Sequence, residues 1–518
     1  MRMRGMPMNE SRPPGCLECL SEPPLFFGFG QPMTDPREGL ALFGPLDESR
    51  PPGITMGVAG TPEGIQRAVK FVKSLQSTVH PTEAKRNRPF YPGFESVFGI
   101  PWNHVPYQLA TINAQTLHRA AHEADRHQRV YDTATLYADA ILEQGRESDS
   151  SVSLWLVVVP PYVWKNCRPN QSIPKTMRTR GKQAIGQAEA RRRDSEPMFD
   201  FEEWKGDDEA YKFDPDFRNQ LKYRLLEKGI PTQIVREDTI AWREFTNDRG
   251  RPKRDLSVLE SQIAWNLSSA VFYKAGGKPW NLGNVRKGVC YIGLVFKQLD
   301  RQKDERTACC AAQMFLNSGD GVVFKGDVGP WYNPKRGDYH LDRNAAFDLV
   351  MTALNSYRIA SQHEPPKELF IHGRTFFSDD EWTGFKEAGG KHTKVVGVRI
   401  SKENCFRLYH SSDNPVMRGT ALIRSESKAV LCTKGWVPRL QTFPGSEVPV
   451  PLSVEVIRGD ADIRLVLRDI LALTKLNYNA CSFADGMPVT LRFADAVGEI
   501  LAAGEHRSTP PLSFKFYI

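Results

Sequence analysis

Hydrophobic positions form two patterns along the chain: short continuous runs and helically spaced stripes. Residues 154–159 are a continuous apolar run stopped by two prolines, which is typical of a strand buried on both faces of a parallel sheet. Pro62 opens a segment whose apolar residues follow the i, i+3, i+4, i+7 spacing of a helix. A helix over 217–226 and a short strand over 232–235 are also expected. This alternation predicts a doubly wound, Rossmann-like α/β domain over residues 150–285.

A different order of elements is expected after residue 286. Strands are predicted in succession over residues 289–296, 307–316 and 321–325. A helix over 343–357 and a strand over 368–372 follow, and the apolar stripe of residues 463–471 predicts another helix. Strands in succession, then helix, strand and helix, form an RNase H-like arrangement, so the fold class is α/β in both domains.

The length of 518 residues allows two or three domains. Residues 1–24 are rich in Pro, Met and Arg and are expected to be a disordered tail. A compact part over 25–149 precedes the Rossmann-like domain at 150–285 and the RNase H-like domain at 286–518. No apolar run approaches the roughly 20 residues needed to span a bilayer, and the first residues lack the apolar core of a signal peptide. A cytoplasmic location is therefore expected.

The formal net charge of +8 is mild evidence for a polyanionic partner. Lysines and arginines cluster between residues 165 and 193, where Glu189 is the acidic residue that opposes them. Such a run is either a solvated surface loop or a set of phosphate contacts along a bound strand.

A group of cationic and amide side chains in the Rossmann-like domain suggests a phosphate site. Arg218 and Lys222 are four residues apart, so a helix places both on one face. Gln233 and Lys274 follow, the latter before a Gly-Gly pair. An arginine can hold an anion with two parallel hydrogen bonds, and lysines neutralise its charge. The alternative is an ordinary solvated helix face.

This set, in this order, resembles the MID domain of short prokaryotic Argonautes, which carry MID and PIWI domains. The resemblance implies that Arg218, Lys222, Gln233 and Lys274 bind the 5′-phosphate of a guide strand. It also implies that the C-terminal carboxylate of Ile518, at the end of an apolar, aromatic-rich strand, helps to hold Mg²⁺ there. Arg218 replaces the usual Tyr or His, which keeps phosphate binding but loses some or all of the stacking on the first base.

The PIWI half departs from the pattern of Argonautes that cleave their targets. Those proteins hold two metal ions with four side chains, which are carboxylates except that one position can be His. The matching positions here are Val295, His372 and Asp495, so a single carboxylate remains and we expect no strand cleavage. Other carboxylates fit turns and a helix start better than a metal site: Asp320, Asp327, Asp379 and Asp380.

Further motifs extend the resemblance over residues 25–518. The run 474–479 is similar to a family element that approaches the guide backbone, which implies that role for Lys475 and Asn477. The runs 272–282, 309–316 and 329–334 look most like short Argonautes paired with a TIR-APAZ protein.

Such a pairing implies a guide RNA, a single-stranded DNA target and a heterodimer that oligomerises on activation. On target pairing the TIR partner would deplete NAD in defence against plasmids or phages, and this chain would be the sensor. Two alternatives stay open. The partner could carry a sirtuin-like or nuclease effector, or the chain itself could be an active RNase H-like nuclease.

Overall fold

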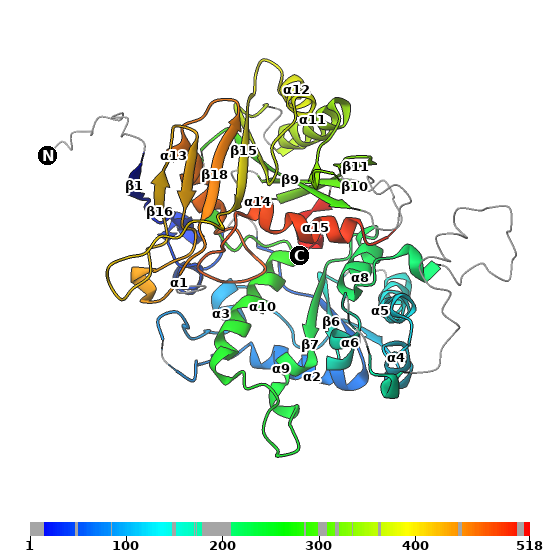
Figure 1. Cartoon of the computed structure of the whole chain (residues 1–518). Helices are drawn as coiled ribbons and strands as arrows, with labels where there is room; N and C mark the ends of the chain where they lie inside the picture. The colour runs from blue at the N-terminus through cyan, green and yellow to red at the C-terminus, as the bar shows by residue number, and fades with distance from the viewer. Residues whose placement is uncertain are drawn as a thin grey trace, which may run out of the picture.

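The two largest β-sheets, each with its own helices, divide the chain into two lobes that share one hydrophobic core (Figure 1). The computed structural model describes residues 15–46, 50–83, 85–147, 152–169, 171, 173–178, 209–283, 286–298, 308–315, 321–333, 335–360, 364–443, 448–504 and 512–517. The first lobe, at the bottom of Figure 1, holds the sheet formed before residue 240, and the second lobe holds the sheet formed mainly after residue 288.

The first lobe is built on a parallel four-stranded sheet in the order β5-β4-β6-β7. The strands are β4 (Met56–Gly60), β5 (Gln108–Thr111), β6 (Leu154–Val159) and β7 (Thr232–Arg236). All residues of β4 and β6 are buried, because helices cover both faces of the sheet. The expected parallel strand at 154–159 and the Rossmann-like arrangement are therefore confirmed.

The helices of this lobe belong to two core clusters, one on each face of the sheet. They are α2 (Pro62–Ser74), α4 (Ala114–Ala120), α5 (Arg126–Glu147), α6 (Pro161–Asn166), α8 (Phe217–Leu226), α9 (Glu237–Ile240) and α10 (Glu260–Lys274). Thr61 caps α2 by accepting a hydrogen bond from the backbone of Gly64, and Pro62 occupies its first turn.

The second lobe contains a ten-stranded sheet in the order β1-β16-β17-β18-β15-β14-β9-β10-β11-β19. The strands are β1 (Cys16–Cys19), β9 (Val289–Gln298), β10 (Ala308–Phe315), β11 (Gly321–Gly329), β14 (Glu368–Gly373), β15 (Lys394–Lys402), β16 (Thr420–Ile423), β17 (Lys428–Leu431), β18 (Leu452–Arg458) and β19 (Leu512–Ser513). Strands β9, β10 and β11 form an antiparallel meander, and β14 lies parallel to β9. This is the expected RNase H-like order.

Helices cover both faces of this second sheet. Helices α11 (Arg343–Ala360) and α12 (Asp379–Gly389) share one core cluster with β9 and β14. On the other side, the shared core of the two lobes contains α13 (Ile463–Leu473), α14 (Val489–Arg492) and α15 (Ala494–Leu501). Helices α14 and α15 are separated only by Phe493.

Contacts across the middle of the molecule join the two lobes. The Tyr478 hydroxyl donates to the Trp280 carbonyl at 2.8 Å, and the Trp280 indole donates to the Lys475 carbonyl at 3.1 Å. Ser269, on α10, donates to the Tyr478 carbonyl at 3.3 Å. Helix α10 of the first lobe therefore packs directly on the segment that follows α13.

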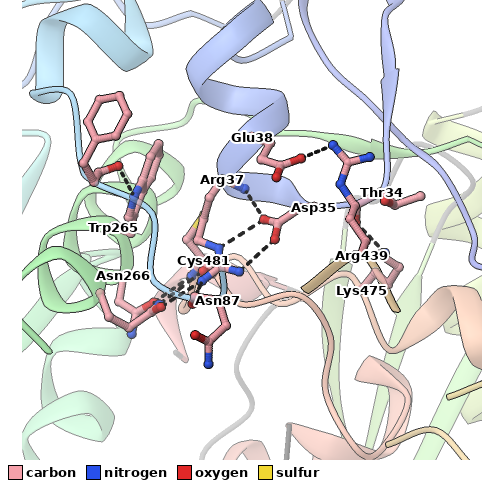
Figure 2. A network of polar contacts seen from close by, with 12 residues as sticks. Thr34, Asp35, Arg37, Glu38, Asn87, Trp265, Asn266, Arg439, Lys475 and Cys481 are labelled. Atoms are coloured by element: carbon pink, nitrogen blue, oxygen red, sulfur yellow. Dashed lines mark hydrogen bonds and ion pairs between the residues drawn. The ribbon is translucent and has the colours of Figure 1, made fainter. Parts of the chain in front are cut away.

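The N-terminal segment strengthens this junction. Asp35 and Arg37 form a buried ion pair at 2.7 Å, and Arg37 donates to the Asn87 carbonyl and to Gln262 on α10. Figure 2 shows this network beside Lys475, whose ammonium group donates to the Thr34 carbonyl at 2.6 Å. The buried polar groups are thus paired across segments that are far apart in sequence.

Three of the expected boundaries are corrected. The sheet of the first lobe includes β4 and β5, so a boundary at residue 150 divides one sheet. The prediction of a disordered tail is wrong for residues 16–24, because β1 pairs with β16 and the Glu22 carboxylate forms ion pairs with buried cations. The C-terminal strand is limited to Leu512–Ser513, and Phe514–Phe516 form a 3-10 turn called η9.

No helix within the described ranges is long and apolar enough to cross a membrane.

Glu22 gives a test of how the N-terminal segment is held. Its carboxylate lies 2.9 Å from the Arg418 guanidinium and 2.8 Å from the Lys475 ammonium, both of which are buried. Burial alone would raise the pKa of Glu22, but Arg418 and Lys475 lower it below its usual value. Glu22→Gln leaves two buried cations without this anion, so we expect a loss of about 3 kcal/mol in urea unfolding.

The matched control is Glu83→Gln, which breaks an exposed pair with Lys85. It is expected to cost much less than Glu22→Gln, because exposed ion pairs are screened by solvent and contribute little to stability. Equal effects of the two substitutions would show that Glu22 is not the anchor of this segment.

Candidate phosphate-binding site

Helix α8 presents two of the predicted side chains toward the junction of the lobes. Asp216 caps the helix by accepting a hydrogen bond from the Asn219 backbone at 2.9 Å. Leu221 and Leu225 of the same helix are buried in the core of the first lobe. Arg218 and Lys222 therefore lie on one helix face, as their spacing predicts.

Both predicted lysines converge on a single backbone carbonyl. The Lys222 and Lys274 ammonium groups donate to the carbonyl oxygen of Thr232 at 3.3 and 3.0 Å. Lys274 also donates to the Gln233 side-chain oxygen at 2.6 Å, and Lys222 lies 3.4 Å from the Thr232 hydroxyl. Thr232 opens β7, Lys222 is on α8 and Lys274 ends α10, so three elements meet here.

Arg218 is also in this group and links it to the end of the chain. Its guanidinium donates to the Tyr517 carbonyl at 3.0 Å and to the Asn219 side chain at 3.2 Å. Tyr517 is buried, and η9 packs against α10. Ile518 lies outside the described residues, so the role of its carboxylate stays a prediction.

The electrostatics of the cluster favour an anion. Burial lowers the pKa of Lys222 and of Lys274 well below the ordinary value, and the neighbouring cations lower both pKa values further. Burial also lowers the pKa of Arg218. Side chains of Lys222 and Lys274 are only 3% and 1% exposed. A phosphate brought among these three groups would stabilise their charged forms and accept strong, charge-assisted hydrogen bonds.

The described residues suit a phosphate better than a protein-bound metal ion. Among them, no group of three or more His, Cys, Asp or Glu side chains is arranged to hold a metal. The oxygens near the lysines are those of Thr232 and Gln233, and both already accept hydrogen bonds. Mg²⁺ is usually bound through carboxylates and substrate phosphates, so Mg²⁺ at this site stays a prediction that depends on Ile518.

Two of the three positions that the resemblance matches to a metal-binding tetrad are buried in the second lobe. Val295, on β9, belongs to the apolar core. His372 is 1% exposed, and its Nδ1 atom lies 2.9 Å from the Thr490 hydroxyl. Burial lowers the pKa of His372 to about 3, so the ring is neutral at physiological pH.

The third position, Asp495, lies in α15, which packs on β9; its side chain is outside the description. The structure therefore brings the elements of the three positions together and places Val and neutral His at two of them.

Lys475 and Asn477 are held by protein groups in this structure. The Lys475 ammonium is buried and bonded to Glu22 and Thr34, and its pKa falls to about 8 because burial outweighs the nearby carboxylate. Asn477 accepts a hydrogen bond from the Asn479 backbone at 3.1 Å. Lys475 takes part in the junction of the lobes, whereas the Asn477 bond is local. Contact of either residue with a guide backbone stays a prediction.

The depressed pKa of Lys274 predicts a pH-dependent stability in protein freed of nucleic acid. The unfolded chain binds this proton more tightly, so the free energy of unfolding should rise from neutral pH toward the ordinary lysine pKa of 10.5. Lys274→Met should make this rise shallower in urea unfolding and should stabilise the protein at neutral pH. Exposed Lys228→Met is the matched control and should follow the unsubstituted protein. An unchanged pH profile in Lys274→Met would contradict the assignment.

Comparisons with known proteins agree with this architecture. No protein-family model matches the chain. The protein argonaute of Aquifex aeolicus is 21% identical over 286 residues, which are 55% of this chain and 36% of the Aquifex protein. The structure of Clostridium butyricum Argonaute, bound to a guide DNA and a 19-mer target DNA, matches 97% of this chain and 54% of its own length, with a TM-score of 0.61 and 14% identity.

Drosophila Piwi matches 97% of this chain and 56% of its own length, with a TM-score of 0.57 and 14% identity. The chain thus spans about half the length of the solved structures that it matches. The chain has the fold of Argonaute and Piwi proteins, and its sequence is similar to that of the Aquifex Argonaute.

Proposed function

We propose that this chain binds the 5′-phosphorylated end of a guide strand and holds the strand for pairing with a target. The observation that carries this proposal is the convergence of Lys222 and Lys274 on Thr232, with Arg218 and Gln233 beside them. The Argonaute fold supports it, because the similar Clostridium structure contains a guide and a target.

Each side chain has a distinct part in phosphate recognition. The two ammonium groups supply charge, and the Thr232 carbonyl fixes where they lie. Arg218 can add parallel hydrogen bonds to phosphate oxygens, and Gln233 has amide donors that are uncharged. These groups recognise a phosphate and no base edge, so target choice rests on base pairing, and affinity falls with salt.

We also propose that the second lobe does not cleave the target. In-line displacement by two metal ions needs several oxygen ligands near the reacting phosphate. Val295 supplies none, and His372 is a buried neutral ring engaged with Thr490. The role of the second lobe is then to bind and orient the paired strands.

The biological output is proposed to come from a partner protein. In the short Argonaute arrangement that the sequence resembles, a guide RNA detects single-stranded DNA, and a TIR-APAZ partner then oligomerises with this chain and hydrolyses NAD. Mg²⁺ at the guide phosphate belongs to the same proposal. A sirtuin-like or nuclease effector is the alternative partner, and a cleaving second lobe is the alternative activity.

Charge reversal in the phosphate site tests guide-end recognition. Lys222→Glu and Lys274→Glu should each weaken binding of a 5′-phosphorylated guide more than binding of the same guide with a 5′-hydroxyl. A lost charge-assisted hydrogen bond corresponds to about 1.5–3 kcal/mol, or roughly tenfold to a hundredfold in Kd. Filter binding measures both guides, and exposed Lys228→Glu is the control. Equal losses for the two guides would show that these lysines do not recognise the 5′-phosphate.

The effector assignment can be tested in one reaction with two readouts. The co-purified complex receives a guide RNA and a complementary single-stranded DNA, with Mg²⁺ present. We expect NAD to be consumed while the labelled target stays at full length, and a non-complementary target should leave NAD intact. A cut opposite the middle of the guide that is abolished by Asp495→Ala would show that the second lobe cleaves. Degradation of DNA without loss of NAD would show that the partner is a nuclease and not a TIR protein.

A further inference from the structure

A second basic feature lies at the other end of the strand that carries the phosphate site. Strand β7 starts at Thr232, beside the lysines, and ends at Arg236, where α9 and then η6 (Trp242–Glu244) begin. Residues 245–254 follow as a hairpin that projects below α9 in Figure 1. We call this segment the basic hairpin.

Its backbone is fixed by local hydrogen bonds. The Asn247 side-chain oxygen accepts from the backbone N–H groups of Arg249 and Arg251 at 3.0 and 3.1 Å. The Asn247 N–H donates to the Arg251 carbonyl, and the Lys253 N–H donates to the Phe245 carbonyl, both at 2.8 Å. Gly250 has a φ of +72°, which suits the turn. The hairpin therefore displays its side chains from a defined scaffold.

The charges on the hairpin face solvent. Arg249, Arg251 and Lys253 are exposed, and none of the three has an ion-pair partner within the described ranges. Arg254 is weakly paired, with its guanidinium 3.8 Å from the Asp238 carboxylate. Fixed, unpaired guanidinium groups are suited to phosphate oxygens, because each can donate two parallel hydrogen bonds.

A cavity of about 650 Å³ opens at the root of the hairpin, between α2, η6 and α10. Its wall includes the apolar residues Phe71, Leu75 and Ile263. Its charged lining includes Arg243, which pairs with Glu260, and Lys70. The volume is within the usual range of small-ligand pockets, roughly 300–1,000 Å³.

Aromatic rings extend this cavity to the surface. His80 lines it and stacks on Phe90, with ring centroids 6.0 Å apart and an interplanar angle of 27°. Phe90 is 50% exposed. The cavity thus has the aromatic pair at one side and η6, from which the basic hairpin continues, at another.

We propose that the basic hairpin and this cavity bind single-stranded nucleic acid that extends beyond the guide-paired segment. One unpaired base enters the cavity against His80 and Phe90, and the neighbouring phosphates contact Arg249, Arg251 and Lys253. This inference rests on the proposed function, which supplies a target strand anchored to the same molecule and hence at high effective concentration. Stacking on aromatic rings beside a cationic track is how proteins hold single strands without reading their sequence.

An acidic protein segment is the competing occupant of a cationic surface. It would use the arginines but has no need of the aromatic cavity beside them, whereas an unpaired nucleotide uses both. The combination therefore favours nucleic acid.

The experiment uses guide-loaded protein and DNA targets that pair identically with the guide. One target ends where pairing ends, and the others carry unpaired extensions of graded length on one side or the other. The unsubstituted protein should bind at least one extended target several-fold more tightly than the blunt one. The triple variant Arg249→Glu, Arg251→Glu, Lys253→Glu should lose this gain and keep its affinity for the blunt target. Its salt dependence on the extended target should fall by about 2 in log–log slope, for three lost phosphate contacts.

Two further variants distinguish the contribution of the cavity to binding from that of general electrostatic attraction. Phe90→Ala should reduce the gain without changing the salt slope and should remove the quenching of 2-aminopurine placed in the extension. The triple control Lys386→Glu, Lys391→Glu, Arg468→Glu changes exposed cations of the second lobe and should keep the gain.

The outcomes distinguish this inference from the proposed function. Guide-dependent binding of the blunt target without any gain from extensions would overturn the inference alone. A gain that survives in the hairpin variant, or that the control loses equally, would also overturn it. Failure to bind even the blunt target would overturn the proposed function, and this inference with it.

Discussion

Two lysine ammonium groups that share one backbone carbonyl are the constraint on which the site depends. Lys222 and Lys274 both donate to Thr232, and Lys274 also holds Gln233. Burial lowers the pKa of both lysines, and Arg218 lowers both pKa values further, so holding these groups charged here is unfavourable. The surrounding structure holds the lysines in place despite this unfavourable energy. An anion that enters the site would reduce the unfavourable energy.

The fold explains why these groups meet. Thr232 starts β7, the edge strand of the first lobe's sheet. Lys222 is on the helix that precedes β7, and Lys274 ends the long helix α10, which comes later in the chain. The second lobe then closes the site, because Arg218 donates to the carbonyl of Tyr517, almost 300 residues further along the chain. The packing of α10 on Tyr478 and Trp280 holds the two lobes together, and the ion-paired N-terminal segment strengthens this junction.

Much of this was predictable from sequence, because helical and strand periodicities are strong where elements are buried on one or both faces. The run at 154–159, the i, i+4 pair Arg218 and Lys222, and the RNase H-like order all have such signatures. Thr232 was not predictable as the shared acceptor, since a backbone carbonyl has no side-chain signal. The strand at 16–19 was missed because Pro-, Met- and Arg-rich composition hid a short edge strand whose partner, β16, is some 400 residues away.

Other residues were assigned by resemblance, and their surroundings could not be deduced from spacing. Lys475 lies in the sequence motif expected to contact the guide. Its ammonium group is instead bonded to Glu22, which was expected to lie in a disordered tail. Sheet membership is likewise a long-range property, so the inclusion of β4 and β5 with β6 was hidden by the intervening helices.

The most direct test is to identify the nucleic acid that co-purifies with the chain after expression in cells. Sequencing and 5′-end analysis should recover short RNAs that carry a 5′-phosphate, bound through the lysine cluster. Purified protein free of short strands and without affinity for added 5′-phosphorylated RNA or DNA would contradict the account.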